Sequence, residues 1–153
     1  MQSPYASKRQ NDQRKPLTSS ILFPEISKRF TENPTAAGSL LGLFIFSILR
    51  RGKISDEWSL LFSARNKAPE VHHQAVPLLS QKARKLPIVV IEIEDRDLVK
   101  YITGGLTGLK GVTSGKIKIA GDVDLALRLE DTFVNAGGIE QTLQFLRRPK
   151  SKL

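Results

Sequence analysis

The side chains that most readily suggest metal binding or catalysis are two adjacent histidines, His72 and His73, the only imidazoles in this chain of 153 residues. Imidazole nitrogens bind metal ions and transfer protons near neutral pH. Adjacent residues of a strand or helix do not point at one ion, however, and Glu70 is the carboxylate nearest to them in sequence. The chain has no cysteine, which excludes thiolate metal sites, cysteine nucleophiles and disulfides. We therefore predict no metal site and no cofactor.

Three carboxylates, Glu94, Asp95 and Asp97, form a second group that could act in acid–base catalysis or bind a cation. They lie where a predicted strand, Leu86–Glu94, meets a predicted helix, Arg96–Thr103. Negative charges at a helix start are stabilised by the helix dipole, and Asp95 is a favourable N-cap residue for this helix. No histidine, nucleophile or further ligand lies nearby in sequence. We interpret the group as structural, and we predict no catalytic residue and no enzymatic activity.

Five glycines between Gly104 and Gly115 suggest a loop that could hold a phosphate through its backbone N–H groups. The segment has neither the Walker pattern nor the G-x-G-x-x-G pattern. The glycines therefore do not by themselves predict a nucleotide site.

The net charge of +9 would favour nucleic-acid binding if it covered one folded face. Instead, residues 1–20 carry +3, residues 82–85 carry +3 and residues 147–153 carry +4, which leaves −1 for the rest. We therefore predict no nucleic-acid partner. Residues 1–20 are polar, and we expect them to form a disordered basic leader.

The most hydrophobic run, Gly38–Leu49, is shorter than the roughly 20 residues that cross a membrane. Its β-branched and aromatic residues predict a strand buried on both faces, with Phe44, Phe46 and Ile48 on one side and Leu43 and Ile45 on the other.

A turn at residues 50–53 and a returning strand, Glu57–Ala64, would complete a hairpin. Trp58 is expected at the sheet edge, with ligand contact as an alternative role. A helix over Ile21–Asn33 would dock its apolar face on the sheet or, alternatively, lie on a membrane surface. Arg65–Lys85 is expected to be a solvated loop or a lid.

The spacing of apolar residues changes from that of a strand to that of a helix within Ser114–Leu129. Lys116 to Ile119 alternate as in a strand, which turns Ile117 and Ile119 inward. Gly121 ends the pattern, and Asp122 is a predicted N-cap. The following helix would present one apolar face, made of Val123, Leu125, Ala126, Leu129 and Phe133. A glycine pair at residues 137–138 would end it, and a short closing helix would follow at Ile139–Arg148.

The Ser-Gly-Lys-Ile-Lys-Ile strand from Ser114, with the helix after it, resembles the sterol carrier protein type 2 (non-specific lipid-transfer protein) family. The segment Glu94–Gly104 is similar to that family's strand end and second helix. The resemblance covers 88–133 and, more loosely, 22–64, and Arg65–Lys85 is longer than the family's usual connection. Where the family often has bulky aromatic residues, this chain has Gly111, Val112 and Thr113.

The resemblance implies an α+β fold in which a mainly antiparallel sheet of about five strands, covered by helices, encloses an apolar tunnel. The lipid-binding domain would span residues 21–148. It also implies a non-enzymatic intracellular carrier of fatty acids, fatty acyl-CoAs or sterols, with transient membrane contact. We expect nine apolar side chains to line the tunnel: Leu98, Ile102, Leu106, Leu109, Val112, Ile119, Leu125, Leu129 and Phe133.

The chain ends in Ser151, Lys152 and Leu153, which is the form of a peroxisomal targeting signal. We therefore expect residues 149–153 to be a targeting tail that binds the peroxisomal import receptor, and the protein to reside in the peroxisome matrix. The alternative function is an adaptor that presents substrate to peroxisomal β-oxidation enzymes or stabilises them, through Arg65–Lys85 or the leader.

Overall fold

The computed structural model describes residues 16–74, 85–102 and 105–136. The predicted closing helix, the targeting tail and most of the predicted leader lie outside the described residues. Within them, no helix is both long enough and apolar enough to cross a bilayer.

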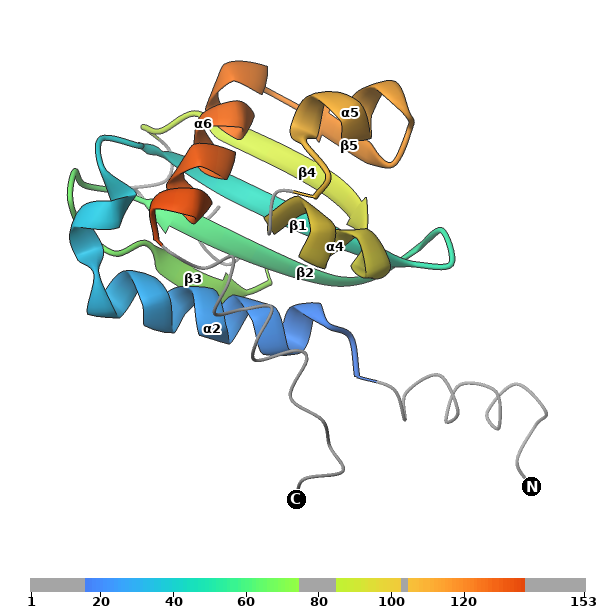
Figure 1. Cartoon of the computed structure of the whole chain (residues 1–153), viewed down its shortest axis with the longest axis horizontal. Coiled ribbons are helices and arrows are strands. Elements are labelled where there is room, and N and C mark those ends of the chain that lie inside the picture. The colour runs from blue at the N-terminus through green and yellow to red at the C-terminus, as the bar shows by residue number, and fades with distance from the viewer. Residues whose placement is uncertain (1–15, 75–84, 103–104, 137–153) are drawn as a thin grey trace.

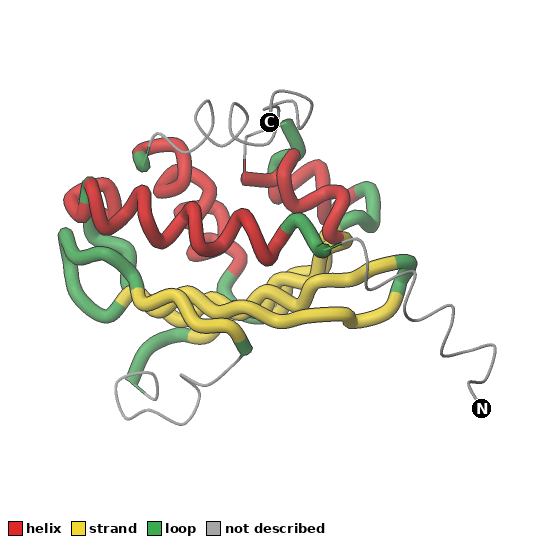
Figure 2. Tube along the Cα trace, turned by 90° about the horizontal axis from the view of Figure 1, so that it is seen from below, coloured by secondary structure: helices red, strands yellow, loops and turns green. Residues whose placement is uncertain are grey.

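One five-stranded sheet forms a layer of the fold, and the helices lie on one side of it (Figures 1 and 2). The strand order is β3-β2-β1-β4-β5, in which β1 and β4 are parallel and the other neighbours are antiparallel. The predicted α+β class with a mainly antiparallel sheet is confirmed. The strands are β1 (Gly42–Arg50), β2 (Lys53–Phe62), β3 (Glu70–His73), β4 (Ile88–Glu94) and β5 (Ile117–Ala120).

The central strand β1 is buried on both faces, as its composition predicts. Phe44, Phe46 and Ile48 belong to the larger core under the helices. Leu43 and Ile45 belong to a smaller cluster with Leu61. Both faces of β1 therefore exclude water, which favours its central position in the sheet.

The β1–β2 hairpin closes on a two-residue turn, Arg51 and Gly52, both with positive φ (55° and 79°). Such turns match the right-handed twist of the strands they join. The Gly52 N–H donates to Glu94 Oε1 at 2.7 Å, which ties the turn to the end of β4. Strand β2 begins at Lys53, four residues before the expected Glu57, because the turn is this short.

The helical layer comprises α2 (Ser19–Glu32), η1 (Pro34–Ala37), α4 (Asp95–Ile102), α5 (Gly108–Thr113) and α6 (Val123–Asn135). Helix α2 buries Leu22, Phe23, Ile26 and Phe30 in the core. Of the two fates considered for this helix, the structure shows docking on the sheet.

Asp95 caps a helix, but a different one from that expected. It is the first residue of α4, and its carboxylate accepts the N–H groups of Thr18 (2.7 Å) and Ser19 (2.9 Å) at the start of α2. The Thr18 side chain makes no capping hydrogen bond itself. A residue 76 positions away in sequence thus satisfies the first donors of α2.

The strand-to-helix passage β5–α6 forms as predicted, since Ile117 is buried and the Asp122 carboxylate accepts the Leu125 N–H. Gly121, with φ of 106°, provides a backbone conformation that other residues rarely adopt. The predicted inward position of Val123 is wrong, because Val123 is 52% exposed. It lies about 200° around the helix from the buried Leu125, at 100° per residue.

Two expectations for the β3 side of the sheet are also wrong. Glu70–His73, within the predicted loop, is strand β3 and pairs with β2. Trp58 therefore lies on the second strand and is buried beneath Phe23, with which it stacks at 5.1 Å. Residues 75–84 of the predicted loop lie outside the described residues.

Replacing Asp95 tests the cap. Asp95→Ala should lower the free energy of unfolding by about 2 kcal/mol, because two N–H groups lose their acceptor at the start of α2. Asp95→Asn keeps one acceptor oxygen and should lower the free energy of unfolding about half as much. Urea denaturation measures both. The exposed Asp124→Ala, in the first turn of α6, is the control and should change stability by less than about 0.5 kcal/mol. Equal losses for Asp95→Ala and the control would contradict the role of Asp95.

Candidate functional site

A row of aromatic side chains crosses the space between the helices and the sheet. Phe23 of α2 lies edge-on to Phe46 of β1, with ring centroids 5.2 Å apart. The ring centroid of Phe46 lies 6.4 Å from that of Tyr101 of α4, which in turn lies 6.5 Å from that of Phe133 of α6. The row joins three helices to the central strand, so α2, α4 and α6 share one continuous apolar layer with the sheet.

Polar atoms without partners occur inside this layer. The Tyr101 hydroxyl, the Trp58 Nε1 and the Ser19 Oγ are buried and have no hydrogen-bond partner among the described residues. Burial, and to a lesser extent the nearby Glu130 carboxylate, raise the pKa of Tyr101, so its hydroxyl stays protonated. A buried hydroxyl without a partner costs about 1–3 kcal/mol. Each of these groups is a donor that the oxygen of a bound molecule would satisfy.

Most of the nine predicted lining residues meet in this layer. Leu98, Ile102, Leu106, Leu125, Leu129 and Phe133 are buried in the same core, and the half-buried Ile119 packs against it. The other two, Leu109 and Val112 on α5, are exposed. Contact of any of the nine with lipid stays a prediction.

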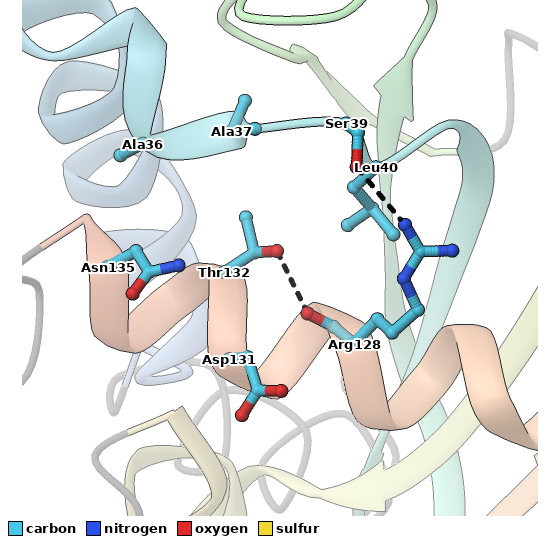
Figure 3. Close-up of a pocket in the computed structure, with 9 residues that line it drawn as sticks. Ala36, Ala37, Ser39, Leu40, Arg128, Asp131, Thr132 and Asn135 are labelled. Atoms are coloured by element: carbon cyan, nitrogen blue, oxygen red, sulfur yellow. Dashed lines mark hydrogen bonds between the residues drawn. The ribbon is translucent and has the colours of Figure 1, made fainter.

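A pocket of about 230 Å³ opens at the edge of the helical layer, between η1 with the chain leading into β1 and the helix α6 (Figure 3). Ala36, Ala37 and Leu40 line it and also belong to the buried core. Arg128 and Asn135 of α6 provide polar groups at its rim, beside Asp131 and Thr132. The pocket therefore joins a polar rim to the apolar layer.

The Arg128 guanidinium is the positive group of this rim. Its Nη2 donates to Ser39 Oγ at 3.4 Å, a long hydrogen bond, and it forms no ion pair among the described residues. The neighbouring Thr132 hydroxyl donates to the Arg128 carbonyl at 2.8 Å and is thus already engaged. An exposed guanidinium in this state can bind a carboxylate or a phosphate.

Sequence reasoning missed this rim. Arg128, Asp131 and Asn135 recur at helical spacing beside the buried stripe, which was the available signal. What the sequence does not reveal is that the chain around Ser39 lies opposite them, because 89 residues separate Ser39 from Arg128.

The catalytic and metal candidates have structural partners. His73 Nε2 lies 2.6 Å from Asp56 Oδ1, while His72 lies 3.4 Å from Glu70. Glu70 is thus not the only carboxylate near the pair, since the β2–β3 pairing brings Asp56 to His73. No group of three metal-ligating side chains occurs within 16–74, 85–102 and 105–136.

The glycine-rich segment has a comparable internal partner, because the Gly108 N–H donates to Glu130 of α6. Burial raises the pKa of the Glu130 carboxyl; this hydrogen bond lowers it and the charge of Asp131 raises it further. The phosphate-loop hypothesis therefore loses one of its N–H groups to a carboxylate within the chain.

Tyr101→Phe tests the unpartnered hydroxyl. The free energy of unfolding should stay the same or rise by up to about 1 kcal/mol, because the change removes a buried polar atom that has no partner. Tyr101→Ala should lower it by about 3–5 kcal/mol through the cavity left by the ring. Thermal and urea unfolding measure both, and a clear loss of stability in Tyr101→Phe would mean that the hydroxyl is bonded.

Comparison with solved structures supports this architecture. Sterol carrier protein 2 of Yarrowia lipolytica, in its apo form, matches with a TM-score of 0.61 and 20% identity, covering 78% of this chain and 92% of that one. Sterol carrier protein 2 like-3 of Aedes aegypti matches with a TM-score of 0.60 and 16% identity, covering 78% of this chain and 99% of that one. Sterol carrier protein 2 of Aedes aegypti was solved in complex with the C16 fatty acid palmitate. It matches with a TM-score of 0.55 and 21% identity, covering 79% of this chain and 98% of that one.

A comparison with curated proteins found no significant match. The family model of the SCP-2 sterol transfer family, by contrast, matches residues 27–134, a span from α2 to the end of α6 that includes every strand of the sheet. The chain belongs to the SCP-2 sterol transfer family.

Proposed function

We propose that this protein is a non-enzymatic carrier that binds fatty acids, fatty acyl-CoAs or sterols between the sheet and its helices. Membership of a sterol transfer family supports this proposal. The observation that carries it is the apolar layer, which contains buried donors that have no partner among the described residues and meets a pocket with the exposed Arg128 guanidinium at its rim. Without a ligand, these unpaired donors do not stabilise the fold, whereas the oxygen of a bound lipid would accept hydrogen bonds from them.

Burial of a hydrocarbon tail supplies the affinity. Each buried methylene contributes about 0.8 kcal/mol, so ten of them give about 8 kcal/mol before the cost of ordering. Beyond Leu40 the core is closed, because Phe44, Leu98 and Leu129 are each 0% exposed. A tail that enters here has to separate α6 from the sheet, so uptake of ligand includes a movement of this helix.

Arg128 would select the head group. A carboxylate at the pocket rim would accept hydrogen bonds from its guanidinium, whereas the hydroxyl of a sterol carries no charge for it to balance. The peptide segment around Ser39 supplies further polar atoms at the same rim (Figure 3).

Displacement of a fluorescent fatty acid from the purified protein tests both the carrier function and the head-group role of Arg128. Arg128→Gln should weaken fatty-acid binding about fivefold and leave sterol binding unchanged, because an exposed charged contact contributes about 1 kcal/mol. Arg96→Gln is the matched control, since Arg96 is also exposed but lies on α4 outside the pocket.

The outcomes are separable. Absence of saturable binding by fatty acids, acyl-CoAs and sterols would overturn the carrier function. Normal fatty-acid binding by Arg128→Gln would overturn only the head-group role of the arginine. Mass spectrometry of copurifying lipids then identifies the natural cargo.

The proposed cellular location is the peroxisome matrix, with the import receptor as a partner. The terminal Ser151-Lys152-Leu153 sequence supports this proposal. A fluorescent protein fused to the N-terminus should colocalise with a peroxisomal marker, and deletion of Leu153 should make it diffuse, because the receptor reads a free carboxylate and an apolar terminal side chain. Deletion of Gln2 is the control. Unchanged location after loss of Leu153 would overturn the signal.

The adaptor for β-oxidation enzymes remains the alternative hypothesis. Part of its expected contact segment, Glu70–His73, is engaged in pairing with β2, and residues 75–84 lie outside the described residues. Stable capture of a β-oxidation enzyme from a peroxisomal extract, lost on exchange of segment 75–84, would favour the adaptor over a pure carrier.

A further inference from the structure

Helix α5 exposes its apolar side chains and buries its glycines. Leu109 is 68% exposed and Val112 is 44% exposed, although both are large hydrophobic residues. Gly108 and Gly111 of the same helix are buried. An ordinary surface helix has the opposite arrangement, with its apolar side chains turned toward the core.

Two contacts hold α5 in this orientation. Gly111 packs so closely on Ile117 that a Cβ at this position would lie 3.0 Å from the Ile117 Cβ and closer still to the rest of that side chain. The Gly108 N–H is bound by Glu130 of α6. A rotation that buried Leu109 would break these contacts, so the exposure of the leucine is built into the packing.

The neighbouring helix α6 adds to the same apolar surface. The large hydrophobic side chains of the described residues that are exposed number eight, and five of them lie on α5 and α6. The helices are in contact through Gly108 and Glu130. Both lie on the helical side of the sheet: α5 is near the β5 edge, and α6 runs from that edge toward η1 (Figure 1). We call these five residues the α5–α6 patch: Leu109, Val112, Val123, Leu127 and Val134.

The charge beside the α5 part of the patch, Leu109 and Val112, is positive. Residues 107–118 contain three lysines, Lys110, Lys116 and Lys118, and no acidic residue. All three lysines are exposed, although Lys118 lies opposite Glu92 in the β4–β5 register. On α6, the Glu130 and Asp122 carboxylates are engaged with backbone N–H groups, while the Asp124 and Asp131 carboxylates are exposed. These acidic residues belong to α6 and its N-cap, and α5 carries none. Leu109 thus projects from a segment that attracts anions.

We propose that α5 docks this carrier on anionic membrane surfaces, with Leu109 and Val112 inserted between lipid head groups and Lys110 and Lys116 beside the phosphates. Protruding apolar side chains flanked by lysines are the combination that binds an anionic lipid interface. The inference rests on the proposed carrier function, because a carrier exchanges its cargo with membranes. Leu106, three residues before Leu109, is already part of the core, so docking brings the bilayer next to the apolar layer.

Cosedimentation of the full chain with vesicles tests the proposal. The wild type should bind vesicles of phosphatidylcholine mixed with phosphatidylserine, and bind phosphatidylcholine vesicles more weakly. Leu109→Ser combined with Val112→Ser should reduce binding to the mixed vesicles about tenfold, through lost apolar insertion. Lys110→Gln should reduce it about fivefold, and high salt should remove this difference.

Ile54→Ser is the matched control, because Ile54 is also 68% exposed but lies on β2, outside the patch. It should bind vesicles as the wild type does. Equal vesicle binding by the double variant and this control would overturn the proposal. Concentration-dependent dimerisation of the wild type that the double variant abolishes, without vesicle binding, would also overturn it and assign the patch to a second copy of the chain.

Fatty-acid binding in the absence of vesicles separates the two proposals. The double variant should bind the fluorescent fatty acid normally and transfer it to mixed vesicles more slowly. If no variant binds fatty acid, the carrier function fails while vesicle binding still decides whether α5 docks on membranes.

Discussion

The burial of one sheet face under a single layer of helices is the constraint on which the rest of this structure depends. Strand β1 pairs with β2 in antiparallel and with β4 in parallel orientation, so β3 and β4, which are successive in the chain, lie on opposite sides of β1. The described helices cover one face of this sheet (Figure 2). Phe23, Phe46 and Tyr101 consequently meet in one continuous apolar layer, and any bound hydrocarbon has to share that space.

Carboxylates satisfy backbone donors at three borders of this layer. Asp95 holds the start of α2, Glu94 holds the β1–β2 turn, and Glu130 holds the start of α5. These acidic groups are thereby committed to structure. Two donors that lack a partner in the described part of the chain, on Tyr101 and Trp58, lie instead within the layer. Local departures from full hydrogen bonding concentrate at functional sites in many proteins, which agrees with the proposed place of the ligand.

The two proposed lipid contacts use opposite chemistry at separate places on the helical layer. The pocket at η1 and α6 combines a polar rim with an apolar floor, which suits one amphiphilic molecule that enters. Helix α5 presents apolar side chains outward beside lysines, which suits a surface that the protein touches. Helix α6 connects them, since Arg128 lines the pocket and Glu130 binds α5. A shift of α6 that admits a lipid tail would therefore also displace Glu130 and alter its contact with α5.

Local patterns in the sequence determined the central strand β1 with its burial on both faces, the β5–α6 passage and the Asp122 cap, because each depends on neighbours within a few residues. They missed strand β3, which forms by pairing with β2. The resemblance to a known family extended this to the α+β class. Only the tertiary structure decided that Asp95 caps α2, that Asp56 meets His73, and that Arg128 faces Ser39. These contacts join residues from 17 to 89 positions apart, and no local period encodes such distances. The outward orientation of Leu109 has the same origin, since the close fit of Gly111 on Ile117 turns the helix against its own hydrophobic pattern.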